Sequence, residues 1–141
     1  MDCKVAVAII AALALAVASC GGSETTTLDR GQLVQQVELA CREAQSTMRE
    51  RFRATRSSLG ALRDSQRQLV DRLEGLEASG GAKHDFNTYM EGVRIRLQAI
   101  QKVVSAPSAE RESVMRSVRG KAEAAMRRSA AAASRLGIDS C

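Results

Sequence analysis

Apolar residues recur at steps of three and four along most of the chain beyond residue 28. This spacing lines apolar side chains along one face of an α-helix, whereas a half-buried strand would alternate apolar and polar positions. The first stripe consists of Leu33, Val37, Ala40, Ala44, Met48, Phe52, Thr55, Leu59, Leu62, Gln66, Leu69, Leu73 and Leu76. The pattern predicts that this half of the chain is helical.

Breaks in the pattern divide the chain into elements. Residues 57–60 (SSLG) are the first interruption, because glycine disfavours a helix interior. Residues 79–82 (SGGA) are typical of a turn, and Pro107 ends one helix and suits the first turn of the next. We therefore predict four helices, over residues 29–57, 60–78, 84–104 and 107–136. Because the apolar spacing continues across Gly60, one long first helix remains the alternative.

Sequence signals also mark the helix ends. Asp29 and Gln32 have the spacing of a capping box, which places the start of the first helix. Asp85 is expected to cap the third helix, and Gly137 to end the fourth. The apolar faces of the last two helices are predicted to contain Phe86, Met90, Val93, Leu97, Ile100 and Val104, then Met115, Val118, Ala122, Ala125, Ser129, Ala132 and Leu136.

Short connections between amphipathic helices favour antiparallel neighbours. We predict an all-α fold, an up-down antiparallel four-helix bundle in which the last helix lies beside the first. The alternative has three helices with one long first helix. Only 2% of the residues are aromatic, and none is Trp. Such a composition suits a helical core better than a β-sandwich, which favours aromatic and β-branched residues.

The N-terminal segment has the character of an export signal. One Lys precedes the unbroken apolar run Val5–Ala18, which is shorter than the roughly 20 residues of a membrane-spanning helix. We predict a signal peptide over residues 1–19. The next residues, GGSETTT at 21–27, are small and polar and cannot bury apolar area. Residues 20–28 are therefore predicted to be a flexible tether, and residues 29–141 the helical domain.

The end of this signal, Val17-Ala18-Ser19-Cys20, resembles a bacterial lipobox. The resemblance implies that cleavage occurs before Cys20 and that its thiol carries a diacylglycerol. Two acyl chains would hold the protein stably at a membrane. The expected location is then the extracytoplasmic side of the cell membrane. A plain secreted protein that is cut near the same place is the alternative.

The remaining cysteines suggest a disulfide. Cys3 leaves with the signal and Cys20 takes the lipid, so that Cys41 and Cys141 remain as a pair in an exported chain. Closing a loop of this length would contribute about 4–5 kcal/mol in the chain-entropy estimate. Two free thiols, one in a helix and one at the chain end, are the alternative.

The helical body resembles the small alanine- and arginine-rich lipoproteins of actinobacteria. The likeness rests on a cysteine in the first helix, within residues 39–44 (LACREA), and on the final residues 136–141 (LGIDSC). The resemblance implies a helical lipoprotein and no particular activity.

Net charge is +5, and six arginines stand out in its distribution. They fall in a narrow angular sector if the first helix continues across Gly60. Their face could meet anionic lipid head groups, an acidic envelope polymer or an acidic protein. A solvated face that also holds glutamates is the alternative. The six are Arg42, Arg49, Arg53, Arg56, Arg63 and Arg67.

Several classes of chemistry lack a sequence signal. A single histidine, His84, cannot build a His-based zinc site, and no phosphate-binding glycine loop or nucleophile elbow occurs. Nucleic-acid binding lacks stacking aromatic residues. We therefore expect no metal, no cofactor, no nucleic acid and no enzymatic activity. An enzyme would need a concave site with carboxylates around His84.

These observations lead to one functional hypothesis and one alternative. The first is a lipid-anchored, non-enzymatic helical module that binds a protein or another component of the cell envelope. The alternative is a carrier of an apolar small molecule or lipid within the bundle. The carrier hypothesis predicts an internal cavity lined by Met48, Phe52, Met90, Leu97 and Met115.

Overall fold

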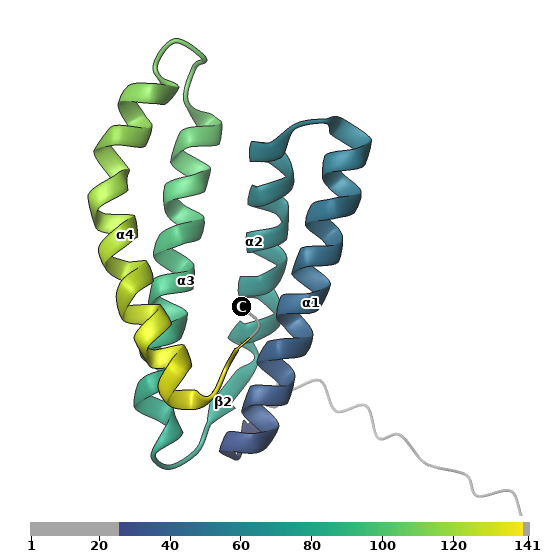
Figure 1. Ribbon diagram of the computed structural model, residues 1–141, viewed down its shortest axis with the longest axis vertical. Helices are drawn as coiled ribbons and strands as arrows, with labels where there is room; N and C mark the ends of the chain where they lie inside the picture. Colours follow the sequence, from purple (N-terminus) through teal and green to yellow (C-terminus); the bar gives the residue numbers. More distant parts are fainter. Residues whose placement is uncertain (1–25, 140–141) are drawn as a thin grey trace, which may run out of the picture.

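The computed structural model describes residues 26–139, which form four helices and two short strands (Figure 1). The elements are β1 (Thr26–Leu28), α1 (Arg30–Thr55), α2 (Ser58–Glu74), β2 (Leu76–Ala78), α3 (Ala82–Ser105) and α4 (Arg111–Leu136). The helices run alternately up and down as two hairpins, α1–α2 and α3–α4. The prediction of an all-α, four-helix, antiparallel architecture is confirmed.

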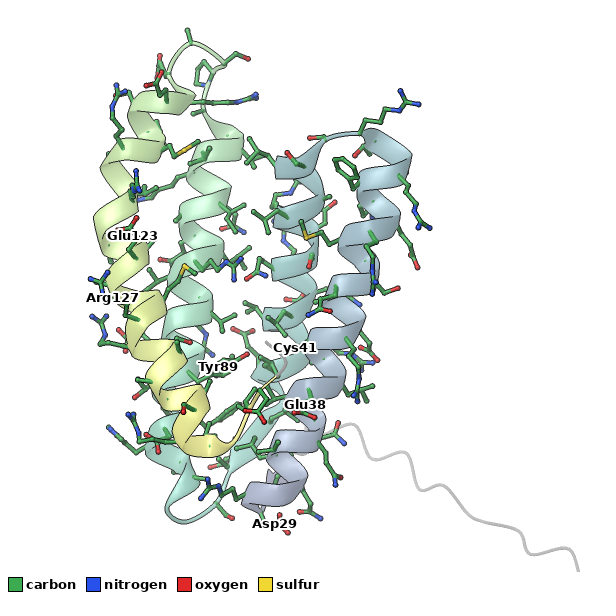
Figure 2. The ribbon with its side chains drawn as sticks, viewed as in Figure 1. Asp29, Glu38, Cys41, Tyr89, Glu123 and Arg127 are labelled. Atoms are coloured by element: carbon green, nitrogen blue, oxygen red, sulfur yellow. The ribbon has the colours of Figure 1, made fainter. Side chains whose placement is uncertain are left out.

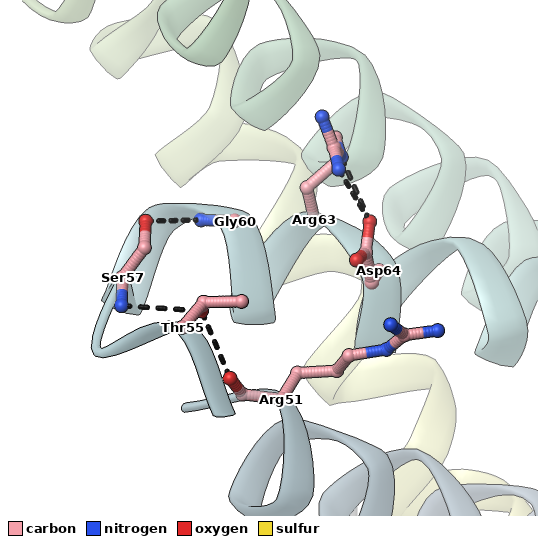
Figure 3. A network of polar contacts seen from close by, with 6 residues as sticks. All are labelled: Arg51, Thr55, Ser57, Gly60, Arg63 and Asp64. Carbon is pink, nitrogen blue, oxygen red and sulfur yellow. Dashed lines mark hydrogen bonds and ion pairs between the residues drawn. The ribbon is translucent and has the colours of Figure 1, made fainter. Parts of the chain in front are cut away.

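A tight turn separates α1 from α2 (Figure 3). Arg56 takes a left-handed conformation with φ of 51°, which ends α1. The Ser57 side chain then accepts a hydrogen bond from the Gly60 N–H at 3.3 Å and caps α2. The Thr55 hydroxyl supports the turn by donating to the Arg51 carbonyl and accepting from the Ser57 N–H. The alternative of one long first helix is therefore wrong.

The predicted helix ends are confirmed in two cases and wrong in two. Asp29 and Gln32 form the reciprocal capping box, and Gly137 ends α4 with φ of 87°. Asp85 does not cap α3, because the helix already begins at Ala82. Pro107 does not begin α4: its carbonyl accepts from the Glu110 and Arg111 N–H groups in a turn before the helix.

β1 and β2 pair in parallel, a feature that the sequence does not predict. Thr26 pairs with Leu76 and Leu28 with Ala78, and the Ser79 N–H extends the pairing by donating to the Leu28 carbonyl at 3.0 Å. The structure therefore differs from the predicted tether over Thr26–Leu28, and the second helix ends at Glu74 instead of continuing to residue 78. This pairing fixes the start of the domain against the α2–α3 connection.

The helices pack in chain order, α1 on α2, α2 on α3 and α3 on α4. The prediction that α4 lies along α1 is wrong. The two helices are joined at their ends, where the Arg30 side chain donates to the carbonyls of Arg135 and Leu136. The most completely buried large side chains, Leu33, Val37 and Leu73, lie toward the β1–β2 end of the domain. The core is consequently concentrated in that half of the molecule.

In the half of the molecule away from β1 and β2, several residues of the predicted apolar stripes are exposed to solvent. Met48 and Phe52 continue the α1 stripe but have exposed fractions of 37% and 49%, and Met115 of α4 is exposed by 48%. Figure 1 shows that α1 and α4 lie far apart at this end, whereas α2 and α3 remain side by side. Helical spacing predicts that these residues are buried, but it cannot show where two hairpins diverge. The hydrophobic core ends before it reaches them.

Helices α3 and α4 approach each other closely at Gly92. A Cβ atom built on Gly92 would lie 2.3 Å from the Ser129 Cβ and 2.9 Å from the Ala125 carbonyl oxygen. The Ser129 hydroxyl donates to the Tyr89 carbonyl at 3.0 Å across the same contact. The absence of a side chain at Gly92 therefore sets the spacing of this hairpin.

Candidate functional site

A groove of about 500 Å³ lies between the two helical hairpins and receives side chains from all four helices. Because α1 and α4 do not pack along each other, they form its walls, and α2 and α3 form its floor. The tail that follows α4 contributes Ile138 and Asp139. The groove is therefore a product of the open side of the helical array, where a closed four-helix bundle would have packed side chains.

Flexible and branched apolar side chains line much of this groove. Met48 and Met126 face it from the two walls, and Leu62, Leu69 and Val93 from the floor helices. Both methionines are among the exposed large apolar residues of the protein. Methionine adapts its shape to different apolar partners, so this lining suits an apolar ligand of variable shape.

Several polar groups of the groove already have partners within the protein. The Ser65 hydroxyl donates to the Ala44 carbonyl at 2.6 Å, and the Ser129 hydroxyl donates to the Tyr89 carbonyl. Both serines are buried. These bonds join α1 to α2 and α3 to α4 beneath the groove, so the hydroxyl hydrogens of these two serines are already used within the protein.

Two polar side chains differ from these serines. Gln66 of α2 has an exposed fraction of 8%, and Arg96 of α3 is half-buried; both line the groove. Within residues 26–139, no side-chain hydrogen bond or ion pair engages either of them. A buried amide and a half-buried cation that have no partner among the described residues mark a place for a polar group of a ligand.

Cys41 and Tyr89 meet at the end of the groove nearer β1 and β2 (Figure 2). The Cys41 Sγ lies 3.8 Å from the Tyr89 hydroxyl oxygen, and both residues are buried. Burial raises the pKa of Tyr89 to about 12, although the positive charge of Arg96 acts in the opposite direction. The tail residue Ile138, itself buried, lines the same end.

The raised pKa of Tyr89 gives a direct spectroscopic prediction. Tyr89 is the single tyrosine of a chain without tryptophan, so tyrosinate absorbance reports this residue alone. The folded protein is expected to titrate near pH 12, against an ordinary value of 10.0 in denaturant. Because the folded pKa is the higher one, the associated stability is complete below pH 10 and is lost between pH 10 and about 12. A folded-state midpoint at 10 would contradict the burial of this hydroxyl.

The five residues that were expected to line one carrier cavity do not lie together in the structure. Met48 lines the groove, whereas Met90 and Leu97 are buried outside its lining. Phe52 and Met115 are exposed and also lie outside the lining. A hollow between helices is therefore present, but sequence spacing identified only one of its residues, and missed Gln66, Arg96 and Met126 as site residues.

The predicted arginine face is divided between two helices. Arg42, Arg49 and Arg53 lie exposed on α1 and Arg56 ends it, and none of the four takes part in an ion pair with another described residue. The reversal of the chain at Ser57 places Arg63 and Arg67 on α2. Arg63 is half-buried and pairs with Asp64 at 2.7 Å. The prediction of a single continuous stripe of six arginines is therefore wrong.

His84, the one histidine of the chain, lies apart from the groove. His84 is exposed in the first turn of α3, outside the groove lining, and its carbonyl accepts from the Thr88 hydroxyl. Neighbouring Asp85 is bonded to Arg135, which lowers the pKa of that carboxyl. Among residues 26–139, no group of histidine, cysteine or carboxylate side chains is arranged to hold a metal ion.

Two predicted site residues, Cys20 and Cys141, lie outside the described residues. The helices within the described part of the chain do not combine the length and apolar character needed to cross a membrane. A comparison with known proteins found no matching protein family, no matching curated protein and no matching solved structure.

Proposed function

We propose that this protein is a lipid-anchored binding protein of the cell envelope that carries an apolar small molecule or lipid in its inter-hairpin groove. The groove is the observation that carries the proposal. Its volume, about 500 Å³, falls in the range of roughly 300–1,000 Å³ that is usual for small-molecule sites. Its lining combines apolar side chains with polar ones that can orient a ligand.

Binding without chemical transformation agrees with the residues in the groove. The two buried hydroxyl groups of its serines, on Ser65 and Ser129, donate to backbone carbonyls, and neither has a histidine or carboxylate as a hydrogen-bond partner among the described residues. Activation of a nucleophile requires such a base within hydrogen-bond reach. We therefore assign the groove a carrier role and no reaction.

Filling the groove is expected to abolish ligand binding. Ala130 is an exposed wall residue of α4, so Ala130→Phe places a ring in the hollow without disturbing the core. Binding of the uncharged fluorescent probe N-phenylnaphthylamine should fall by about tenfold or more, since the apolar contact area is lost. Ala131→Phe is the matched control, because Ala131 is exposed on the same helix and does not line the groove. Equal affinity of both variants would refute the groove as the binding site.

The location of the protein rests on its N-terminal sequence. Residues 1–19 carry the features of a signal peptide, and Val17-Ala18-Ser19-Cys20 resembles a lipobox. We expect mass spectrometry of the mature protein to find a diacylglycerol on Cys20. Cys20→Ser should move the protein from the membrane fraction to the soluble fraction, because the acyl chains provide the stable anchor. An unmodified Cys20 in the native membrane-bound protein would refute the anchor.

A second candidate function uses the outer face of α1. Arg42, Arg49 and Arg53 are exposed and free of ion pairs within the described chain, which favours contact with an acidic envelope polymer or protein. Such binding would be salt-dependent and would persist in Ala130→Phe. The groove-filling variant therefore separates the two candidates.

We further propose that Cys41 and Cys141 form a disulfide that holds the C-terminal tail in place. Cys41, Ile138 and Asp139 line the same end of the groove, and Cys141 follows Asp139 by two residues. Two extended residues add about 7 Å of reach beyond Asp139, and the proposed bond uses this reach to join Cys141 to Cys41. An exported protein would retain such a bond.

A further inference from the structure

We propose that the groove selects a single-chain amphiphile with a carboxylate head, which Arg96 and Gln66 bind while its apolar chain lies against Met48, Leu62 and Met126. This inference rests on the proposed carrier function and specifies its ligand. The argument has three parts, the charge at Arg96, the amide of Gln66 and the size of the apolar lining.

Arg96 supplies the charge complement for an anionic head group. It is half-buried in the groove, and no described carboxylate pairs with it; the neighbouring Arg94 bonds Glu74 instead. Asp139, the acidic residue among the described lining residues, is in the tail and forms no ion pair with Arg96. A guanidinium binds a carboxylate through two parallel, charge-assisted hydrogen bonds. The groove therefore contains an unused cation in a position that a carboxylate can reach.

Gln66 is an independent observation that points to the same ligand. Its side chain is more than nine-tenths buried, lines the groove and makes no hydrogen bond to another described residue. Every fully buried side-chain nitrogen or oxygen atom of the described residues has a hydrogen-bond partner. The Gln66 amide has none, so it is not fully enclosed and is accessible from the groove that it lines. An amide N–H in this position can donate to the second oxygen of a head group. Buried polar side chains normally have a partner, and here a ligand would supply it.

The apolar lining sets the class of ligand. Met48, Leu62 and Met126 share with Arg96 the end of the groove that lies away from β1 and β2. The total volume of about 500 Å³ is that of a small-molecule site. A single alkyl chain with one charged head matches this combination of apolar side chains and one cation at the same end of the groove.

Titration calorimetry with three ligands of equal chain length tests the head group. Dodecanoate, dodecanol and dodecyltrimethylammonium carry negative, neutral and positive heads on one chain, and each is used below its micelle concentration or, for dodecanol, below its solubility limit. Dodecanoate is expected to bind about tenfold or more tightly than dodecanol, and dodecyltrimethylammonium most weakly, because only the carboxylate forms charge-assisted hydrogen bonds.

Variants then assign the selectivity to residues. Arg96→Gln should weaken dodecanoate binding about tenfold and leave dodecanol binding unchanged, since only the charged contact is lost. Arg128→Gln removes the same charge from an exposed site outside the groove and should have no effect. Gln66→Leu keeps the side-chain volume and should weaken dodecanoate several-fold. Circular dichroism and thermal unfolding of each variant check that the fold is retained.

The outcomes separate this inference from the proposed function. Equal binding of dodecanoate and dodecanol, or an unchanged dodecanoate affinity in Arg96→Gln, would overturn the carboxylate proposal while leaving the groove a carrier site. Failure of all three ligands and of the neutral probe to bind would overturn both. A ligand-free dimer that dissociates on substitution of Met48 and Met126 would show that a second copy occupies the groove, and would also overturn the proposal.

Discussion

Gly92→Ala is expected to lower the free energy of unfolding by about 3 kcal/mol, as in other overpacked cores. An added Cβ would lie 2.3 Å from the Ser129 Cβ and 2.9 Å from a backbone oxygen of α4. The backbone atom cannot move without shifting the helix, so the α3–α4 hairpin must open. Its opening would also stretch the bond from the Ser129 hydroxyl to the Tyr89 carbonyl. Urea denaturation followed by circular dichroism measures the change.

Gly120→Ala is the matched control for this prediction. Gly120 also lies inside a helix, but a Cβ there would have no atom within 4 Å. Alanine in a helix is favoured over glycine, so this variant should gain about 0.5–1 kcal/mol. Opposite signs for the two substitutions are the expected result. A gain of stability in Gly92→Ala would show that α3 and α4 are further apart than described.

Loss of the proposed disulfide is expected to have an effect of similar size. Cys141→Ser should destabilise the protein by about 2–5 kcal/mol, because the unfolded chain regains the freedom of a loop of some hundred residues. Without the bond, the tail would no longer be fixed to α1, and Ile138, which is buried in the core, would be held less firmly. Thermal or urea unfolding of the oxidised mature protein measures the difference.

The reducing agent serves as the control for that experiment. Reduction of the wild-type protein should reproduce the loss of stability, and reduction of Cys141→Ser should change nothing. Non-reducing intact-mass analysis provides the complementary test. Two alkylatable thiols, at Cys41 and Cys141, would contradict the disulfide.

The helices could be predicted from sequence because their signals are local. The apolar spacing, the Asp29 capping box and Gly137 depend on residues within one or two turns of each other. The sequence predicts an interruption near residue 57, but the position of the turn depends on the left-handed conformation of Arg56, which residues other than glycine rarely adopt. Local signals therefore located the elements to within a few residues.

The strands and the groove depend on distant contacts. β1 is only three residues long and pairs with a segment some fifty residues later, so neither strand has a periodic pattern of its own. The groove arises because the hairpins diverge, a property that helical spacing does not encode. Gln66 gave one available signal, since it is a polar residue within the predicted apolar stripe. Arg96 had no comparable signal before the fold was known.

The pairing of β1 with β2 determines how the domain would stand on a membrane. Cys20 precedes Thr26 by six residues, which span at most about 20 Å. On the proposed anchoring, the strand end of the domain therefore faces the lipid head groups. Met48 follows Arg30, the first residue of α1, by 18 residues. At the rise of a regular helix it therefore lies about 27 Å along the helix from that end. The end of the groove that contains Met48 would then lie away from the bilayer, so a ligand chain held there would be kept at a distance from the anchoring leaflet.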